Sequence, residues 1–330
     1  MNGEVGVAFI GAGTVAEMHG RGVMAVPGAR LAGIYDLDAA KASAIASRFG
    51  GRVFDSLDDL LSDRSVDAVH VLTPIEHHVP NAIASLQAGK HVLLEKPVAK
   101  TQTEIAMLKT AATKAGRVCM PAHNYIYAPS VRRARRLIES GKLGKIASLW
   151  ILYNIFHSDQ VAATYGGVLR AICTHHAYSV LYLLGRPRRV TAVVSRVHER
   201  KLRCEDQALI VCEMENGAIA NLWSSFAADD PTNDPWTVVY KILGTNGGVN
   251  YSWNEAQFTD EGGPAWGMPC YEESFMAEID YFINHCVRAG ESPLSTLDDA
   301  ADALSILTAA EHAISRPDSM EKVIYEGDAL

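Results

Sequence analysis

The sequence predicts an α/β protein of two domains, with a doubly wound parallel sheet first and an α+β domain with a large, mostly antiparallel, open-faced sheet second. Three observations carry this prediction. The chain has 330 residues, 48% of them hydrophobic, which is more than one ordinary core holds. Strands and helices alternate regularly through its first third. Its second half instead contains long alternating stretches separated by turns, as antiparallel sheets do.

The first domain is expected to span residues 1–122 and to consist of repeated strand–helix units. The expected strands are Val5–Ile10, Arg30–Tyr35, Val53, Val66–Leu72, His91–Leu94 and Val118–Met120. The expected helices are a stretch ending at Met24, then Lys41–Phe49, Leu57–Ser62, Val79–Ala88 and Thr101–Ala115. Because parallel strands need crossover connections and helices supply them, this alternation is typical of a doubly wound sheet.

The second domain is expected to span residues 123–330. Its expected strands are Ile146–Phe156, Val190–Val197, Ala208–Glu213, Ala218–Phe226, Thr237–Leu243 and Gly248–Trp253. Its expected helices are Ser130–Ser140, Thr174–Leu184, Tyr271–Ala289 and Leu297–Ser315. Turn sequences such as Glu215–Gly217 separate neighbouring strands and favour antiparallel pairing.

Composition excludes several classes of protein. The net charge is −8, and the densest basic cluster, Arg132, Arg133, Arg135 and Arg136, has the pattern of a solvated helix face, so we expect no nucleic-acid partner. No run of about 18 apolar residues is present, so we expect no membrane span. The six cysteines form no CxxC pair, which favours reduced thiols and a cytoplasmic location.

A glycine-rich turn of the form G-x-G-x-x-A follows the first expected strand and comprises Gly11, Ala12, Gly13, Thr14, Val15 and Ala16. Such a turn lets the backbone approach a pyrophosphate, and the following helix offers it free N–H groups. Asp36 lies 23 residues beyond Gly13, close to the roughly 20-residue spacing of the acid that binds the adenine ribose. Asp38 adds negative charge that would repel a 2′-phosphate. We therefore expect NAD rather than NADP.

Charge also follows the strand His91–Leu94, in the stretch LLEKPVAK at 93–100. Open α/β sheets place ligand sites at the carboxyl ends of their strands. Lys96 is therefore either a solvated loop lysine or a group held there for chemistry.

Taken in order, the motifs resemble the Gfo/Idh/MocA family, the nicotinamide-dependent oxidoreductases similar to glucose-fructose oxidoreductase and myo-inositol dehydrogenase. The matching segments are GAGTVA at 11–16, TPIEHH at 73–78, AGKHVLLEKPVA at 88–99, HNYIYAP at 123–129, LIESGKLGKI at 137–146 and GGVLRAICTHHAYSVLYLLG at 166–185. The resemblance covers most of the chain and is weakest after about residue 250. It implies an NAD-binding Rossmann domain, an enzyme that acts on CH–OH groups, and a homodimer or homotetramer.

The resemblance also implies roles for individual residues. Lys96 is expected beside the nicotinamide and the reacting oxygen of the substrate, with Glu95 shaping the cofactor site. The Lys–Pro peptide in this motif is commonly cis. Thr73, Pro74 and His78 of the TPIEHH segment are expected to contribute to cofactor binding.

The second family signature, G-G-x-L-x-D-x-G-x-H, is only partly kept. Gly166, Gly167, Leu169 and His175 match it, whereas Ala171, Cys173 and Tyr178 stand where Asp, Gly and a later Asp are usual. The missing Asp puts the usual polyol substrate and the usual dyad in doubt. His175 is expected to act alone as the base, because an imidazole titrates near working pH.

Three further residues have two possible roles each. His176 and Tyr178 either contact substrate or pack in the helix. Arg170 either binds a carboxylate or phosphate of the substrate or lies on the surface. Tyr125, Tyr127 and His157 are candidates for the wall of the substrate site. We expect no metal site at Cys173, His175 and His176, because adjacent histidines cannot easily share one tetrahedral ion.

The sequence thus predicts an NAD-dependent oxidoreductase that interconverts a secondary alcohol and a ketone on a sugar, cyclitol or related ring. The balance of Ala171 and Arg170 favours an acidic or partly deoxygenated ring. Two alternatives stay open. One is a glycosidase or lyase that retains NAD and oxidises a sugar transiently. The other is a non-catalytic NAD-binding sensor, which the missing Asp would suit.

Overall fold

A computed structural model describes residues 4–158, 162, 166–198, 204–228, 237–252, 268–316 and 319–328 of the chain. These residues form two compact units. Unit 1 comprises residues 1–128 and 272–300, and unit 2 comprises residues 129–271 and 301–330. The boundary therefore differs from the expected one after residue 122, and residues 272–300 return to the first unit.

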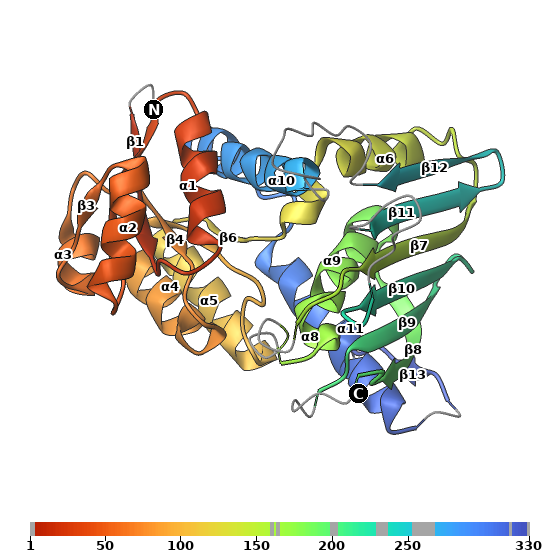
Figure 1. Cartoon of the computed structure of the whole chain (residues 1–330). Coiled ribbons are helices and arrows are strands. Elements are labelled where there is room, and N and C mark those ends of the chain that lie inside the picture. Colours follow the sequence, from red (N-terminus) through yellow and green to blue (C-terminus); the bar gives the residue numbers. More distant parts are fainter. Residues whose placement is uncertain are drawn as a thin grey trace, which may run out of the picture. The chain divides into compact units, whose positions relative to one another are not determined.

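A six-stranded parallel sheet forms the centre of unit 1 (Figure 1). Its strands are β1 (Val5–Ile10), β2 (Ala29–Tyr35), β3 (Arg52–Val53), β4 (Ala68–Val71), β5 (His91–Leu94) and β6 (Cys119–Pro121). They lie in the order β3-β2-β1-β4-β5-β6, and every pairing is parallel. β1 and β4 are buried along their whole length, as strands covered on both faces should be. The predicted doubly wound sheet is confirmed.

The helices of unit 1 begin and end where local signals place them. They are α1 (Ala16–Ala25), α2 (Ala39–Phe49), α3 (Leu57–Ser62), α4 (His78–Gln87) and α5 (Gln102–Ala115), with short 3-10 turns η1 (Ile75–His77) and η2 (Asn124–Tyr127). The Asp38 side chain caps α2 by accepting from two backbone N–H groups. Thr101 and Glu104 form a capping box on α5, and Gly116 ends that helix in the left-handed conformation.

Residues 272–300 belong to unit 1 through contacts that join distant parts of the chain. They include most of α10 (Met268–Asp280) and the π-helical turn η3 (Tyr281–Arg288). A Cβ added to Gly22 of α1 would lie 2.3 Å from Ile279 Cδ1, so α1 and α10 approach closely at this glycine. Asn124 Nδ2 donates to Ser274 Oγ at 3.0 Å. Hydrophobic periodicity shows that α10 is a helix but not which sheet it covers.

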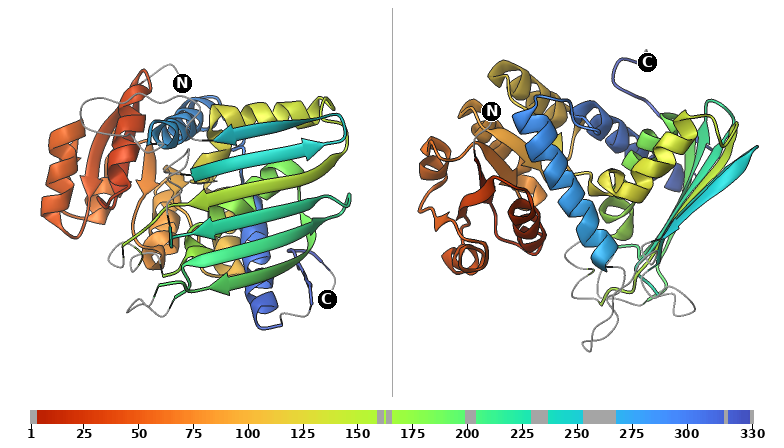
Figure 2. Two further views of the ribbon diagram at one scale, coloured as in Figure 1. Left: turned by 45° about the vertical axis from the view of Figure 1, so that its right-hand side comes forward. Right: turned by 90° about the horizontal axis from the view of Figure 1, so that it is seen from above.

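A seven-stranded sheet forms one side of unit 2 (Figure 2). Its strands are β7 (Ile146–Asn154), β8 (Pro187–Ser195), β9 (Gln207–Met214), β10 (Ile219–Ser225), β11 (Thr237–Gly244), β12 (Gly247–Ser252) and β13 (Glu321–Lys322). Their order is β12-β11-β7-β10-β9-β8-β13. β7 and β10 pair in parallel, and the other described pairs are antiparallel. The predicted mostly antiparallel sheet is confirmed; Trp253, the expected end of its last long strand, lies outside the described residues.

Helices cover one face of this sheet (Figure 2). They are α6 (Pro129–Glu139), α8 (Val168–Ala171), α9 (Cys173–Leu184) and most of α11 (Leu297–Ile314). Along β7, Leu149 and Ile151 are buried while Trp150 between them is 45% exposed. This alternation is typical of an antiparallel sheet with one open face. Within the described chain, no helix is both long and apolar enough to cross a membrane.

Candidate active site

The glycine loop lies where the strand order of unit 1 reverses, between β1 and β4. Gly11 has a φ of +102°, and a Cβ there would lie 2.8 Å from the carbonyl of Leu72. Glycine is therefore required at this position. A Cβ added to Gly13 would meet nothing within 4 Å, so the space in front of the loop is open. The loop, completed by Thr14 and Val15, leads directly into α1 and has the form that receives a pyrophosphate.

Asp36 is held beside this loop. Its Oδ2 accepts from the Ala12 backbone N–H at 2.7 Å, and its Oδ1 accepts from the Asp38 N–H at 2.8 Å. The carboxylate thus lies at the carboxyl end of β2, next to the glycine turn. An acid in this position is suited to accept hydrogen bonds from ribose hydroxyls.

Thr73 and Pro74 follow β4 on the other side of the switch point. The Thr73 hydroxyl is buried and has no hydrogen-bond partner among the described residues. A buried polar group without a partner is costly, and a cofactor is one source of the missing partner. The open space at Gly13 and this hydroxyl both fit a bound dinucleotide.

His78 connects this loop with the turn after β5. Its Nε2 lies 2.7 Å from the Thr73 carbonyl oxygen and its Nδ1 lies 2.8 Å from the Pro97 carbonyl oxygen. Burial lowers the pKa of His78, and a neutral ring donates to one carbonyl at a time. The side chain therefore supports the two loops, and its expected contribution to cofactor binding passes through them.

Lys96 lies at the carboxyl end of β5, in the turn that the resemblance singled out. The Lys96–Pro97 peptide is cis, as that resemblance implied. The Glu95 side chain folds back toward its own backbone, and its Oε2 accepts from the Lys96 backbone N–H at 2.9 Å. Burial lowers the pKa of the Lys96 ammonium, and the neighbouring Glu95 carboxylate opposes that shift.

A second buried carboxyl, Glu278 of α10, was not singled out by the sequence. Its side chain has no exposed area, and neither oxygen has a hydrogen-bond partner among the described residues. Burial, and then the negative charge of Glu95, raise its pKa well above the usual 4.5. The raised pKa favours the protonated, neutral form of Glu278.

Replacing Glu278 with Gln should make the free energy of unfolding less dependent on pH. Because the folded-state pKa is raised, the folded wild type keeps a proton that the unfolded chain releases above about pH 4.5. Wild-type stability is therefore lost as the pH rises, by up to about 1.4 kcal/mol per pH unit until the folded pKa is reached. Urea unfolding across this range measures the difference, with the exposed Glu273→Gln on the same helix as control. Parallel stability curves for Glu278→Gln and wild type would contradict the assignment.

In unit 2 the candidate base His175 lies on α9 and is 4% exposed. Its Nδ1 forms a short hydrogen bond with the Tyr178 hydroxyl, one helical turn further along. Ser179 Oγ donates to the His175 carbonyl at 2.7 Å and lies 3.0 Å from the Tyr240 hydroxyl. Tyr178, at the later Asp position of the signature, thus orients the imidazole.

His176 is buried on α9 of unit 2. Its Nδ1 lies 3.2 Å from Ser224 Oγ, which also accepts from Cys173 Sγ at 3.4 Å. The ring is fully buried, and burial lowers its pKa to about 3, so it remains neutral. Among the described residues, no group of three acidic, histidine or cysteine side chains is placed to hold a metal ion.

The remaining candidates are distributed through the two units. Arg170 forms a two-pronged ion pair with Glu311, at 2.5 Å on each side, so its guanidinium already has a carboxylate partner. His157 Nε2 lies 3.2 Å from the Tyr153 hydroxyl, and its ring packs edge-on against Phe226. Tyr125 is 3% exposed within η2 of unit 1.

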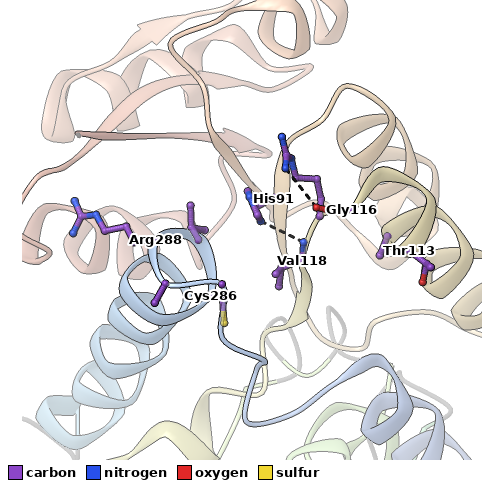
Figure 3. A pocket seen from close by; sticks show the side chains of 11 residues that line it. His91, Thr113, Gly116, Val118, Cys286 and Arg288 are labelled. Carbon is purple, nitrogen blue, oxygen red and sulfur yellow. Dashed lines mark hydrogen bonds between the residues drawn. The ribbon is translucent and has the colours of Figure 1, made fainter. Parts of the chain in front are cut away.

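A shallow pocket of about 610 Å³ in unit 1 lies away from the glycine loop and the Lys96 turn (Figure 3). His91 at its wall begins β5, so the pocket lies at the amino end of the strand whose other end carries Lys96. Arg117 donates to the Gly89 carbonyl, and Arg288 donates to the carbonyls of Pro27 and Gly28. The pocket therefore lies at the opposite end of β5 from the Lys96 turn.

A doubly wound sheet with a glycine loop at its switch point and an acid after β2 defines a dinucleotide-binding protein. Comparison with known proteins is more specific. Residues 5–123 match the family model described as "Oxidoreductase family, NAD-binding Rossmann fold", and residues 131–250 match the "GFO/IDH/MocA C-terminal domain". The chain belongs to the Gfo/Idh/MocA family of NAD-binding oxidoreductases, which act on CH–OH groups. The expected cofactor, NAD, is that of the family.

Several relatives and solved structures are similar along nearly the whole chain. The scyllo-inositol 2-dehydrogenase (NAD(+)) of Bacillus subtilis (strain 168) is 26% identical, with 95% of each chain covered. The 4-carboxy-2-hydroxymuconate-6-semialdehyde dehydrogenase of Sphingobium sp. (strain NBRC 103272 / SYK-6) is 29% identical, covering 91% of this chain and 96% of the relative. The structure of GenD2 from gentamicin A biosynthesis, in complex with NAD, has a TM-score of 0.85 and 27% identity, covering 98% and 97%.

Proposed function

We propose that this protein is an NAD-dependent dehydrogenase that interconverts a secondary alcohol and a ketone on a sugar, a cyclitol or a related hydroxylated ring. The observation that carries the proposal is Lys96, which lies at the carboxyl end of β5 in the NAD-binding unit with the Glu95 carboxylate behind it. The names of the scyllo-inositol dehydrogenase and the other relatives supply the class of substrate.

Two residues of this chain handle the proton in the proposed reaction. NAD, when bound, supplies the hydride acceptor at nicotinamide C4. Lys96 donates a hydrogen bond to the reacting oxygen and stabilises the negative charge that develops there. His175 accepts the hydroxyl proton, as a neutral imidazole can. That both residues act on one substrate is part of the proposal and rests on the family.

Tyr178 replaces the usual carboxylate in this scheme. When the His175 Nδ1–H donates to the phenol oxygen, Nε2 keeps the lone pair that a base needs. A phenol orients the ring without the negative charge that an Asp would add.

Tyr178→Phe should therefore lower kcat about 5-fold, because one neutral hydrogen bond contributes about 1 kcal/mol. The Kd for NAD should be unchanged. Steady-state kinetics and a cofactor titration measure both quantities, and Tyr182→Phe on the same helix is the control. A wild-type kcat in Tyr178→Phe would remove the orienting role.

The substrate ring is proposed to be neutral and hydroxylated. The expected preference for an acidic or partly deoxygenated ring relied on Ala171 and Arg170 together, and the Arg170 guanidinium is engaged by Glu311. The name of the relative from Sphingobium gives a carboxylated substrate, so carboxylated compounds stay among those to be tested.

A turnover screen of cyclitols, sugars and their acids with NAD tests the proposal. The absorbance of NADH should rise with at least one hydroxylated ring. Release of an aglycone without net NADH would instead indicate the NAD-retaining glycosidase or lyase. Tight NAD binding with no reaction of any compound would indicate the sensor.

We also propose that copies of the chain associate through the open face of the unit 2 sheet, which would give the homodimer or homotetramer that the family resemblance implied. Large apolar side chains are exposed on its strands, among them Trp150, Val193 and Ile219. Exposed apolar surface of this kind favours association.

All six cysteines are free thiols, which suits the reducing cytoplasm.

A further inference from the structure

A buried series of hydrogen-bonded side chains links α1 with the turn that carries Lys96. His19 of α1 has no exposed area, and its Nε2 lies 3.2 Å from Glu95 Oε1. The other Glu95 oxygen accepts from the Lys96 backbone. On its opposite side, His19 Nδ1 lies 3.0 Å from Nδ1 of His70, a fully buried residue of β4. His19 thus joins three parts of unit 1, namely α1, β4 and the turn after β5.

Aromatic packing fixes both imidazoles. The His70 ring stacks on Phe9 at 5.3 Å between centroids, and Phe282 meets it edge-on at 5.6 Å. Phe275 meets the His19 ring edge-on at 5.5 Å. Neither histidine can turn away from its partner without disturbing this packing.

The contacts determine where the protons lie. Two Nδ1 atoms that face each other share one proton, and His70 Nε2 is buried without a partner among the described residues. A proton on that Nε2 would leave a buried N–H without an acceptor, whereas a lone pair there costs less. His70 therefore donates from Nδ1 to His19, and His19 donates from Nε2 to Glu95. Burial keeps the pKa of His70 well below 6.5, which agrees with a neutral ring.

Among these buried side chains and the charged and titratable groups around them, Glu95 carries the negative charge. Glu95 faces His19, Lys96, His78 and Glu278, and the raised pKa of Glu278 favours its neutral form. Contacts with His19 and Lys96 lower the pKa of Glu95 in spite of its burial. Lys96 in turn faces His123, whose pKa is lowered to about 3, so His123 adds no positive charge.

We propose that His19 is a positioning residue for the reaction, because it holds the Glu95 carboxylate in place behind Lys96. The inference rests on the proposed function and extends it. The same helix that receives the cofactor at its amino terminus thereby fixes the carboxylate that supports the reacting lysine. A displaced Glu95 leaves the Lys96 ammonium with less opposite charge and with a less defined position.

Two variants separate the donor from the bulk of the side chain. The amide nitrogen of Gln reaches the place of Nε2 and can donate to Glu95, whereas that of Asn reaches only the place of Nδ1. His19→Asn should lower kcat about 10²-fold, the loss expected when a reacting group is misplaced by about 1 Å. His19→Gln should recover most of the wild-type kcat. His91→Asn, at the other end of β5, is the matched control.

The pH dependence of Lys96 itself gives a readout that needs no turnover. Acylation of Lys96 by acetic anhydride, followed by mass spectrometry, reports its titration. In His19→Asn the midpoint should move to lower pH by about one unit, because a weakened anion no longer opposes the effect of burial. His19→Gln should titrate like wild type. If His19→Asn does not fold, His19→Met, which also lacks a donor, takes its place.

Equal titration of Lys96 in the wild type and in the variants without a donor would overturn the proposal. Equal impairment of His19→Gln and His19→Asn would also overturn it, because the role would then be packing alone. If the titration shifts as described but the wild type oxidises no compound in the screen, the proposed function fails and the positioning of Lys96 stands.

Discussion

Replacing Lys96 with Met is expected to reduce kcat by about 10³-fold while the Kd for NAD changes little. Methionine keeps the length and apolar stem of lysine but cannot donate a hydrogen bond to the reacting oxygen. Removing one donor to a developing oxyanion costs about 10²–10³-fold, and proton handling adds to the loss. The cofactor loop and Asp36 are untouched, so binding of NAD should persist. Steady-state kinetics and a fluorescence titration with NADH measure the two effects.

Lys100→Met is the matched control for this prediction. Lys100 lies four positions further along the same turn, but its side chain is 51% exposed and pairs with Glu76 at 2.8 Å. The same substitution there should leave kcat near the wild-type value. Near-normal turnover in Lys96→Met with NAD still bound would contradict the role that we assign to Lys96.

Replacing Asp36 with Ser is expected to lower the preference for NAD over NADP by about 10- to 100-fold in kcat/KM. The carboxylate lies beside the glycine loop, where it can accept hydrogen bonds from ribose hydroxyls and repels a 2′-phosphate. A hydrogen bond to a charged group contributes about 1.5–3 kcal/mol, which corresponds to this range. Serine removes the charge and keeps a short polar side chain. Initial rates with each cofactor at saturating substrate measure the ratio.

Asp38→Ser provides the comparison. Asp38 also carries a negative charge near the loop, but its carboxylate caps α2, and serine caps helices well. The NAD preference should change much less in this variant. A wild-type enzyme that already prefers NADP would contradict the reading of Asp36.

Local signals were enough to predict the elements of unit 1 and the position of its cofactor loop. The G-x-G-x-x-A turn follows a buried strand, and its first glycine has the positive φ that makes glycine necessary. The capping residues Asp38 and Thr101 mark the starts of their helices. Such features depend on neighbours in the sequence, so a single sequence contains them.

Contacts between distant parts of the chain could not be predicted in the same way. His19 and Glu95 are 76 residues apart, and neither has a spacing that identifies a partner. In the sequence, Glu278 is one more polar residue of an amphipathic helix. The structure shows that it is buried in unit 1. The pair of Arg170 and Glu311 joins residues 141 positions apart, and it changes the expected role of Arg170.

Transfer of a labelled hydride tests the central claim most directly. A ring substrate found in the turnover screen is prepared with deuterium on the carbon that bears the reacting hydroxyl, and the NADH is recovered after reaction. Mass spectrometry should find one deuterium on the nicotinamide ring of each NADH formed, with the ring ketone as the other product. Recovery of oxidised NAD together with an eliminated or hydrolysed product, and no deuterium in the nicotinamide pool, would contradict the assignment as a dehydrogenase.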